Sequence, residues 1–482
     1  MVLKRTAIFC IALALIAVFA TDLLAGGYSA LGIGARARGM GGAFRAVADD
    51  WSAVYYNPAG LAKIEQSQLN WTLDLNNLRP AYDPDVSIDG YEFGYPTTGE
   101  RYPDDIIAWS PNMAGVVVGP FGLPLTAAFA IFEPFDENVT WDLYRFLPAY
   151  DTINSKLPEY DFIFDFDVID FHASFAKSFM EDRLHLGCGF SLLRGDLYTG
   201  RIYHEPNELG YPYDIRPYEY FVTSSVSDAY GFGFGADVGI LFDVNDKISV
   251  GANYRTKSTL KMDGDIIQSL YTPDSREYQN SIPYTEEKLD TLFSGHTFTA
   301  KHEGDIEMTM PSEFGLGVSV RPSETVTLAA DVKFTQWSEL EDLDIEYTMI
   351  NGMTGWSNID AMLTSLSYPY QWDDAVRFSA GIESQVKDNI IVRGGYSYDQ
   401  SPVPDDQATP LIIDTGDSHH IAGGLSYFYN KFEFAVTGEI VSMPDRDVDD
   451  LTDINDDGIW DNLNGTYTNT SYNASFSVTL RF

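Results

Sequence analysis

An acidic segment near the C-terminus has the ligand spacing of a calcium-binding loop. Oxygen ligands at the first, third, fifth and ninth positions, with a backbone carbonyl at the seventh, would come from Asp453, Asn455, Asp457, Ile459 and Asp461. Gly458 at the sixth position permits the sharp turn of such loops. The twelfth position is Asn464 instead of a bidentate glutamate, and no helical pattern flanks the segment. The sequence therefore predicts either a calcium site or a solvated acidic loop.

Residues for catalysis are scattered along the chain and lack the order that enzymes need. The chain has seven histidines, of which only His419 and His420 are adjacent, and strand alternation sends these two to opposite faces. No Ser/His/acid order, zinc spacing or phosphate loop is present, and the run Gly231, Gly233, Gly235 is not followed by a helix. We therefore expect a protein that is not an enzyme.

The elements that must position these residues are strands. The last segment alternates strictly, with apolar side chains on one face and small polar ones on the other. The apolar set is Tyr472, Ala474, Phe476, Val478, Leu480 and Phe482. A period of two places one face of this strand against an apolar medium and the other against water. An alternating terminal strand that ends on an aromatic residue is typical of barrels in the bacterial outer membrane.

Six short polar turns separate long alternating runs. They are Pro120 to Pro124, Met180 to Arg183, Asp243 to Lys247, Pro322 to Glu324, Lys387 to Asn389 and Tyr429 to Lys431. Long polar insertions lie between them, for example Gly200 to Tyr220, Asp263 to Thr299 and Pro402 to Asp417. Short turns on one side and long loops on the other indicate an outer-membrane barrel. If both chain ends lie on the short-turn side, six turns predict an all-β membrane protein with a 14-stranded antiparallel transmembrane β-barrel.

The charge pattern agrees with a wall that is apolar outside and polar inside. Alternation places Phe232 and Phe234 outside, but Asp331 and Lys333 inside, and lysine or arginine on the lipid face would cost roughly 2–4 kcal/mol at the bilayer midplane. The net charge is −41, from 30 Lys and Arg against 71 Asp and Glu. Nucleic acids and anionic lipids require basic patches, so neither is an expected partner, whereas lipid of the outer membrane is.

The N-terminal part divides into two segments. Lys4 and Arg5 precede an apolar run from Ile8 to Ala20 and then small residues, which is the layout of a secretory signal peptide, assigned here to residues 1–25. Residues 26–63 are rich in glycine and carry only short helical signals, Arg36 to Phe44 and Ala48 to Tyr55. This stretch cannot bury a core alone, and a fourteen-stranded barrel is too wide for its own side chains to fill. We expect residues 26–63 to be an N-terminal hatch, or plug, inside a barrel of residues 64–482.

Three separated blocks carry a resemblance to a known family. They are GARARGMGGAFRAVADDWSAVYYNPAGLA (Gly34 to Ala62), MPSEFGLGVSVRPSETVTLAADVKFTQW (Met310 to Trp337) and RGGYSYDQSPVPD (Arg393 to Asp405). In this order they resemble the FadL-type outer-membrane transporters of long-chain fatty acids and other hydrophobic compounds. The hatch motif is Asn57, Pro58, Ala59 and Gly60. The first block is also similar to barrels that serve protein secretion across the outer membrane, so a scaffold with a secretion-system partner is the alternative.

The resemblance implies uptake of a hydrophobic small molecule. The ligand would enter among the outer loops, reach a pocket above the hatch and leave sideways through the wall into the membrane. A fatty-acid carboxylate would need a cationic partner, and alternation turns Arg255, Arg377 and Arg393 toward the lumen at suitable heights. These three arginines are the expected ligand-binding residues, unless carboxylates of the wall neutralise them.

Overall fold

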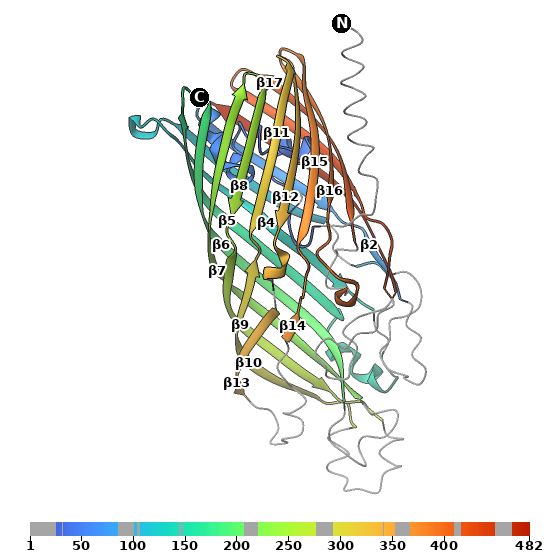
Figure 1. Ribbon diagram of the computed structural model, residues 1–482. Helices are drawn as coiled ribbons and strands as arrows, with labels where there is room; N and C mark the ends of the chain where they lie inside the picture. Colours follow the sequence, from blue (N-terminus) through green and yellow to red (C-terminus); the bar gives the residue numbers. More distant parts are fainter. Residues whose placement is uncertain are drawn as a thin grey trace.

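The computed structural model is a closed, tilted β-barrel with long strands (Figure 1). It describes residues 26–30, 32–84, 101–103, 107–143, 146, 148–206, 220–275, 293–340, 342–351, 367–408, 416–448 and 465–482. The signal peptide and the proposed calcium loop therefore lie outside the described residues. Among the described residues, no helix has the length and apolar character to cross a bilayer.

The wall has fourteen antiparallel positions, as the sequence predicts. Ten positions are single strands: β1 (Gln68–Asn77), β3 (Ile107–Val118), β4 (Thr126–Trp141), β5 (Phe162–Phe179), β6 (Leu184–Pro206), β7 (Tyr220–Asn245), β16 (Ile390–Asp399), β17 (Ser418–Tyr429), β18 (Phe432–Ser442) and β20 (Gly465–Arg481). Four positions consist of two successive strands each: β8 (Ile248–Arg255) with β9 (Ser258–Tyr271), β10 (Thr297–Met310) with β11 (Glu313–Ser323), β12 (Val326–Thr335) with β13 (Asp342–Asn351), and β14 (Ser367–Pro369) with β15 (Ala375–Lys387). The short strands β2 (Pro80–Pro84) and β19 (Arg446–Val448) pair with the outer end of β20.

The six short turns connect the hairpins at one end of the barrel. They join β3 to β4, β5 to β6, β7 to β8, β11 to β12, β15 to β16 and β17 to β18, so each predicted turn is confirmed. The C-terminus lies at this same end (Figure 1). The last strand, β20, pairs with β18 on one side and with β1 on the other, which closes the barrel.

The faces of the strands follow the predicted alternation. On β7, Phe234 is 76% exposed on the outside, and Asp237 is 3% exposed on the inside. On β11 and β12, Glu313 and Lys333 form a buried ion pair of 2.8 Å within the lumen. Cys188 is a free cysteine of intermediate exposure on the outer face of β6, between the exposed Leu186 and Phe190. Apolar side chains thus cover the outside where lipid is expected.

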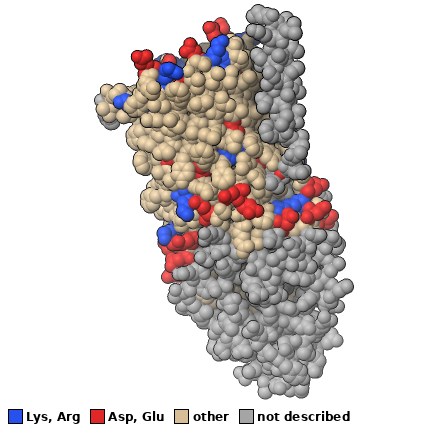
Figure 2. Space-filling view, in the orientation of Figure 1, with Lys and Arg blue, Asp and Glu red and all other residues tan. Residues whose placement is uncertain are grey.

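Several strands continue well beyond the lipid-facing band, so the expected length of the outer loops was wrong. Residues Asp263 to Thr299, predicted as one polar insertion, contain most of β9 and the start of β10. The outer face of these strands is charged, with Lys301 paired to Asp265 at 2.6 Å and Lys261 to Glu307. Figure 2 shows charged side chains gathered in a band below the tan surface. The change from apolar to charged residues marks the boundary of the bilayer on this side of the barrel.

Residues 26–63, called the hatch below, lie inside the wall. They contain α2 (Ala35–Gly39), α3 (Ala53–Tyr56) and the 3-10 helix η1 (Pro58–Lys63), which are shorter than the two predicted helical segments. Phe44, Val54 and Leu61 are fully buried and belong to an apolar cluster with wall residues such as Ala130 and Phe132. The hatch therefore gains a core only by packing against the barrel, as its composition predicts.

Candidate functional site: the hatch, an internal pocket and an incomplete seam

Three hatch arginines bind carboxylates on different parts of the wall. Arg36 pairs with Glu383 of β15 at 2.8 Å, and Arg45 pairs with Asp331 of β12 at 3.4 Å. The same Asp331 carboxylate accepts the backbone N–H groups of Phe44 and Arg45, both at 2.8 Å. Buried ion pairs give orientation as much as stability, because removing one partner leaves an uncompensated charge. The hatch is thus held in one orientation by contacts distributed around the lumen.

Arg38 connects two strands that are distant in the sequence. Its guanidinium binds Asp74 of β1 at 2.9 Å and Glu439 of β18 at 3.0 Å. Burial alone would lower the pKa of Arg38, but the negative charges of Asp74 and Glu439 outweigh this effect and raise that pKa above its usual value. Arg38 therefore stays charged although it is buried.

The hatch motif docks the end of the hatch onto the wall. The side chain of Asn57 accepts a hydrogen bond from the N–H of Ala59 at 3.1 Å, which caps η1, and donates to the carbonyl oxygens of Arg45 (2.9 Å) and Ile240 (3.1 Å). Pro58 lies against Gly187 of β6 so closely that a Cβ there would collide with it. The residues of the motif therefore position η1 against two glycines of the wall, Gly187 and Gly239.

The three arginines predicted to bind ligand all point inward and all contact other groups of the protein. Arg377 donates to Asp399 (3.1 Å) and to Ser397 (3.0 Å). Arg393 donates to Glu383 at 2.6 Å and to Ser426 at 2.6 Å. Arg255 donates to the carbonyl oxygen of Tyr55 at 3.3 Å, and its guanidinium lies 4.8 Å from the Tyr55 ring centroid. The structure does not bring the three together in one cavity, and none of them lines the pocket described next.

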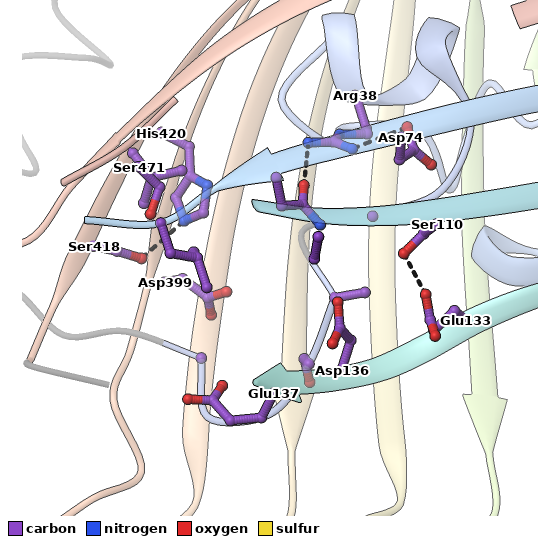
Figure 3. A pocket seen from close by; sticks show the side chains of 18 of the residues that line it. Arg38, Asp74, Ser110, Glu133, Asp136, Glu137, Asp399, Ser418, His420 and Ser471 are labelled. Atoms are coloured by element: carbon purple, nitrogen blue, oxygen red, sulfur yellow. Dashed lines mark hydrogen bonds and ion pairs between the residues drawn. The ribbon is translucent and has the colours of Figure 1, made fainter. Parts of the chain in front are cut away.

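A pocket of about 350 Å³ lies between the hatch and the wall. The hatch contributes Gly26, Ser29 and Arg38, among others, and the wall contributes residues of β1, β3, β4, β16, β17, β18 and β20. Figure 3 shows that carboxylates dominate its labelled lining: Asp74, Glu133, Asp136, Glu137 and Asp399. This volume fits a small organic molecule.

The pocket lies beside an incomplete seam of the barrel. Strands β3 and β4 form a hairpin, yet their pairing runs only from Val118↔Thr126 to Met113↔Ile131. Farther from the turn, residues Ile107 to Asn112 pair with β1 and not with β4. From Phe132 to Trp141, β4 pairs with β5 and not with β3, and Phe135 bridges to Ser29 of the hatch. Both separated stretches line the pocket, which therefore reaches the wall where the ladder is missing.

A bulge in β4 accompanies the loss of pairing. Glu133 and Pro134 together oppose the single residue Ile169 between the pairs Phe132↔Asp170 and Phe135↔Val168. Such an extra residue bends a strand and disrupts the local ladder. The bent stretch binds the hatch, because Ala30 N–H donates to the Pro134 carbonyl at 2.9 Å and Asp136 N–H donates to the Tyr28 carbonyl at 3.3 Å. The Ser110 hydroxyl donates to Glu133 across the gap.

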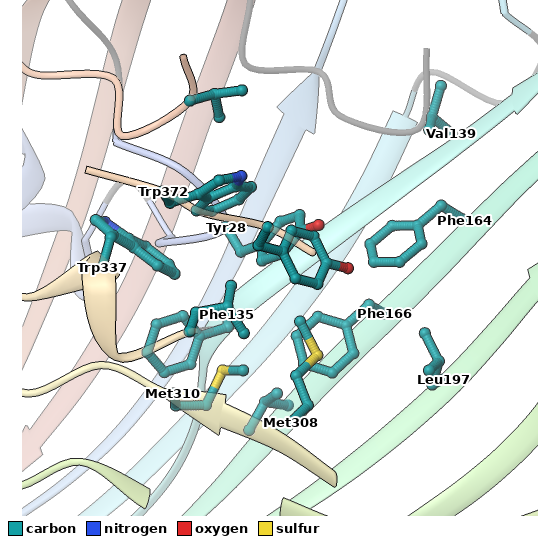
Figure 4. Close-up of a cluster of buried hydrophobic side chains, with 14 of the residues drawn as sticks. Tyr28, Phe135, Val139, Phe164, Phe166, Leu197, Met308, Met310, Trp337 and Trp372 are labelled. Carbon is teal, nitrogen blue, oxygen red and sulfur yellow. The ribbon is translucent and has the colours of Figure 1, made fainter. Parts of the chain in front are cut away.

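An apolar cluster fills the lumen next to the pocket. Its centre is Tyr28 of the hatch, whose ring stacks on Phe164 at 5.5 Å and meets Trp372 at 4.8 Å (Figure 4). Trp337, from the 3-10 helix η4 (Trp337–Glu339) between β12 and β13, is 6.2 Å from the Tyr28 ring. Phe135 and Trp141 of β4 are buried members of this cluster. Apolar surface thus borders the polar pocket, and the hatch contributes to both.

The proposed calcium ligands Asp453 to Asp461 lie outside the described residues, so the site remains a prediction. Within the described part of the chain, no group of three or more His, Cys, Asp or Glu residues has a geometry that would hold a metal ion.

Sequence reasoning missed the residues around the seam. Asp74 and Glu133 were not proposed as site residues, although a carboxylate in an alternating strand is a usable signal. Pro111 and Pro134 are a second signal, because proline cannot donate to a ladder and is confined to strand edges and bulges. Each lies close to the point where β3 and β4 separate.

A lipid-facing barrel that contains its own N-terminal segment and an internal pocket at an open seam defines a transport protein of the bacterial outer membrane. The chain belongs to one family of such proteins: the family model described as "Outer membrane protein transport protein (OMPP1/FadL/TodX)" matches residues 16–482. The family resemblance and the outer-membrane location inferred from the sequence are therefore confirmed. The relatives are transporters and not enzymes, as expected.

Similar proteins agree over most of the chain. A long-chain fatty acid transport protein of Escherichia coli is 23% identical over 423 residues, which cover 84% of this chain and 82% of that protein. A putative outer membrane protein of Neisseria meningitidis is 21% identical over 416 residues, 82% of this chain and 81% of that protein. Among solved structures, a FadL homologue of Pseudomonas aeruginosa has a TM-score of 0.73 at 18% identity, over 95% of this chain and all of that one. The toluene transporter TodX of P. putida has a TM-score of 0.66 at 16% identity, over 94% and 99%. These structures support the fold.

Proposed function

We propose that this protein takes up hydrophobic small molecules, either long-chain fatty acids or other hydrophobic compounds, and releases them sideways into the outer membrane between β3 and β4. Relatives described as a long-chain fatty acid transport protein and a toluene transporter support the substrate class. The pocket volume of about 350 Å³ suits a small molecule. The same volume gives no support to the alternative, a secretion scaffold that handles whole protein chains.

The incomplete β3–β4 seam is the observation that carries the proposal. Residues of both separated strands line the pocket on one side. On the outer surface of β3, Ile107, Trp109 and Met113 are more than half exposed, as expected for side chains that face lipid. A molecule that leaves the pocket here enters hydrocarbon directly. Each Å² of apolar surface kept from water stabilises it by about 25 cal/mol, so this path is favoured over one through the aqueous lumen.

The hatch would act as plug and as part of the gate. We divide the chain into a signal peptide (1–25), a hatch (26–63) and a barrel (64–482). Backbone hydrogen bonds join Tyr28 and Ala30 of the hatch to the bent stretch of β4. A ligand that displaces residues 28–30 would therefore change the pocket and the seam together, because the same peptide groups contact both. Arg255, Arg377 and Arg393 would contact ligand only after exchanging their present partners.

Closing the seam tests lateral release. Cysteines replace Ser110 and Glu133, whose side chains meet across the gap, in a Cys188→Ser background, and the pair is joined by oxidation or by a short bifunctional thiol reagent. The control pair is Asn70→Cys with Thr479→Cys, which are directly opposed on the complete β1–β20 seam.

We expect cross-linking at the gap to reduce uptake of a labelled hydrophobic substrate at least tenfold, and cross-linking of the control pair to leave uptake unchanged. Normal uptake through a protein that is fully cross-linked between β3 and β4 would refute lateral release at this seam.

A further inference from the structure

The pocket and its exit through the seam are strongly acidic. Five carboxylates line the pocket: Asp74, Glu133, Asp136, Glu137 and Asp399. Two more on β5 border the bent stretch, because Asp167 is directly opposite Asp136 in the ladder and Asp165 is directly opposite Asn138. Like charges on opposed strand positions are unfavourable unless another group lies between them. Asp74 and Asp399 have arginine partners, whereas Glu133, Asp136 and Asp167 form no ion pair with a cation among the described residues.

The positive groups at the pocket are already occupied by the protein. Arg38 is shared between Asp74 and Glu439, at 2.9 Å and 3.0 Å. His420 contacts Glu439 at 3.3 Å and Ser418 at 2.8 Å. Neither group is free to bind the carboxylate of a ligand. A fatty acid would have to bring its negative charge into a pocket whose described lining has one arginine, Arg38, which is already bound to two carboxylates.

Two buried polar atoms that line the pocket lack a partner among the described residues. Asn112 is 1% exposed, and its Nδ2 donates to Asp74 at 2.7 Å, but its Oδ1 accepts no hydrogen bond there. The hydroxyl of Ser471, which is 2% exposed, has no partner in the same part of the chain. Both side chains belong to the pocket lining, and Ser471 is shown there in Figure 3. A buried amide oxygen without a donor is costly, which points to a ligand that supplies one.

We propose that this pocket selects hydrophobic molecules whose polar end donates hydrogen bonds and is cationic or uncharged, such as alkylamines and alcohols, and that it discriminates against carboxylates. This inference rests on the proposed function, since it concerns the molecules that pass the same seam. A protonated amine would lie between Asp136 and Glu133 and donate to the Asn112 amide oxygen. The adjoining apolar cluster around Tyr28 would hold the hydrocarbon chain.

The test compares three ligands of equal chain length. Radiolabelled octylamine, octanol and octanoate are titrated at pH 7 against the purified full-length protein in detergent, where the amine is protonated and the acid is ionised. We expect the amine to bind at least tenfold more tightly than the acid, with the alcohol between them.

Variants of the same size but without charge test whether this order of affinities arises in the pocket. The double variant Glu133→Gln with Asp136→Asn keeps the size and one acceptor oxygen of each side chain but removes their charges. We expect it to reduce the amine-to-acid ratio to less than threefold, by weakening amine binding and improving acid binding. The control Glu307→Gln removes an exposed carboxylate on the outer face of β10 and should leave the ratio unchanged. Correct folding is checked by the characteristic shift of unheated barrels in gel electrophoresis.

The outcomes separate this inference from the proposed function. Equal binding of amine and acid, or a preference for the acid, refutes the inference even if cross-linking of the β3–β4 seam still blocks uptake. Binding of calcium alone, with no amine binding, would make the acidic pocket a metal site and also refute it. Uptake that is unaffected by the cross-link refutes lateral release, whatever the binding order is.

Discussion

Two seams of the barrel flank the paired strands β1 and β3: β1–β20 on one side and β3–β4 on the other. They differ in the opposite way to what chain connectivity would suggest. The β1–β20 seam joins strands from the two ends of the wall, yet it is paired without interruption from Gln68↔Arg481 to Asn77↔Tyr472. The β3–β4 seam is a local hairpin, but it keeps only six residue pairs before the strands separate. Local hairpins close more easily than long-range pairs, because less chain entropy is lost. The gap is therefore encoded by particular residues and does not reflect a difficulty in closing the sheet.

The polar contacts around the seams show the same difference. On the complete seam, Asn70 donates to Ser477 and to Thr479, both at 2.8 Å, and thereby joins the two strands. At the gap, the inward bend of β4 replaces backbone pairing with one side-chain hydrogen bond and with hatch contacts. The first seam resists opening, whereas the second depends on groups that a ligand or the hatch can displace.

Arg38 should have the largest effect on this comparison, because it binds Asp74 of β1, the strand that forms the complete seam with β20 and pairs with β3 beside the gap. Arg38→Ala leaves Asp74 and Glu439 buried without a cation, which costs about 3–5 kcal/mol. We expect a looser hatch, measured as leakage of small polar solutes, together with altered uptake of hydrophobic substrate. Arg45→Ala also loosens the hatch but lies away from the gap, so it should cause leakage with little change in hydrophobic uptake. Equal effects of both variants on uptake would show that Arg38 has no special connection to the seam.

An arginine on the lipid face should have the second-largest effect, because its cost in folding free energy should differ between the two seams. Phe476 of β20 faces outward on the complete seam, and Phe476→Arg should reduce the free energy of unfolding in lipid vesicles by about 2–4 kcal/mol. Trp109→Arg introduces the same charge beside the gap, near the outer end of β3, and should cost less than Phe476→Arg because the penalty falls toward the membrane interface. Denaturant titrations followed by tryptophan fluorescence give both values. A larger loss for the Trp109 variant would contradict the position assigned to the gap.

Removing the bulge should make the incomplete seam resemble the complete one. Deletion of Pro134 leaves Glu133 alone opposite Ile169 of β5, which removes the extra residue. The strand can then straighten and continue its pairing with β3. We expect uptake to fall about tenfold, which corresponds to about 1.4 kcal/mol, without a loss of folded protein. Pro134→Ala keeps the extra residue and should have a much smaller effect. Unchanged uptake after the deletion would show that the bulge does not maintain the opening.

The smallest expected effect comes from the single hydrogen bond across the gap. Ser110→Ala removes the donor to Glu133 and should favour opening by about 1 kcal/mol, so the initial uptake rate rises up to about fivefold. Thr72→Ala removes a hydroxyl that donates to Ser477 at 3.0 Å on the complete seam and should leave the uptake rate unchanged. A slower rate for Ser110→Ala would mean that this hydrogen bond supports the open state.

The sequence was sufficient for the fold because period-two alternation and turn chemistry are local. The outward face of β7, the inward charges of β11 and β12 and all six short turns follow from neighbouring residues. Residues Asp263 to Thr299 were predicted as a loop, because the outer face of this part of β9 is charged, for example at Asp263 and Asp265, and does not show an apolar alternation. Charged outer faces are what strands require once they leave the bilayer.

The candidate site was predictable only in part, because it depends on register and on long-range partners. The hatch motif from Asn57 to Gly60 was identified as a block, but its contact with Gly187 appears only when β6 is placed beside it. Alternation correctly predicted that Arg255, Arg377 and Arg393 face the lumen, but it could not predict which groups they bind. Likewise, Glu133 and Pro134 form a bulge because both lie opposite the single residue Ile169 of β5. This pairing cannot be predicted from the sequence of β4 alone.

The two carboxylates that bind Arg38 also constrain how the molecule is built. Asp74 and Glu439 are separated by most of the chain and become neighbours only when β20 has joined β18 to β1. The binding site for Arg38 of the hatch is therefore complete only when β20, the last strand in the sequence, has paired with both neighbours. Closure of the barrel and docking of the hatch are therefore expected to finish together, as one cooperative step. A barrel that has not yet bound the hatch would lack both ion pairs of Arg38 and the fixed orientation that they give.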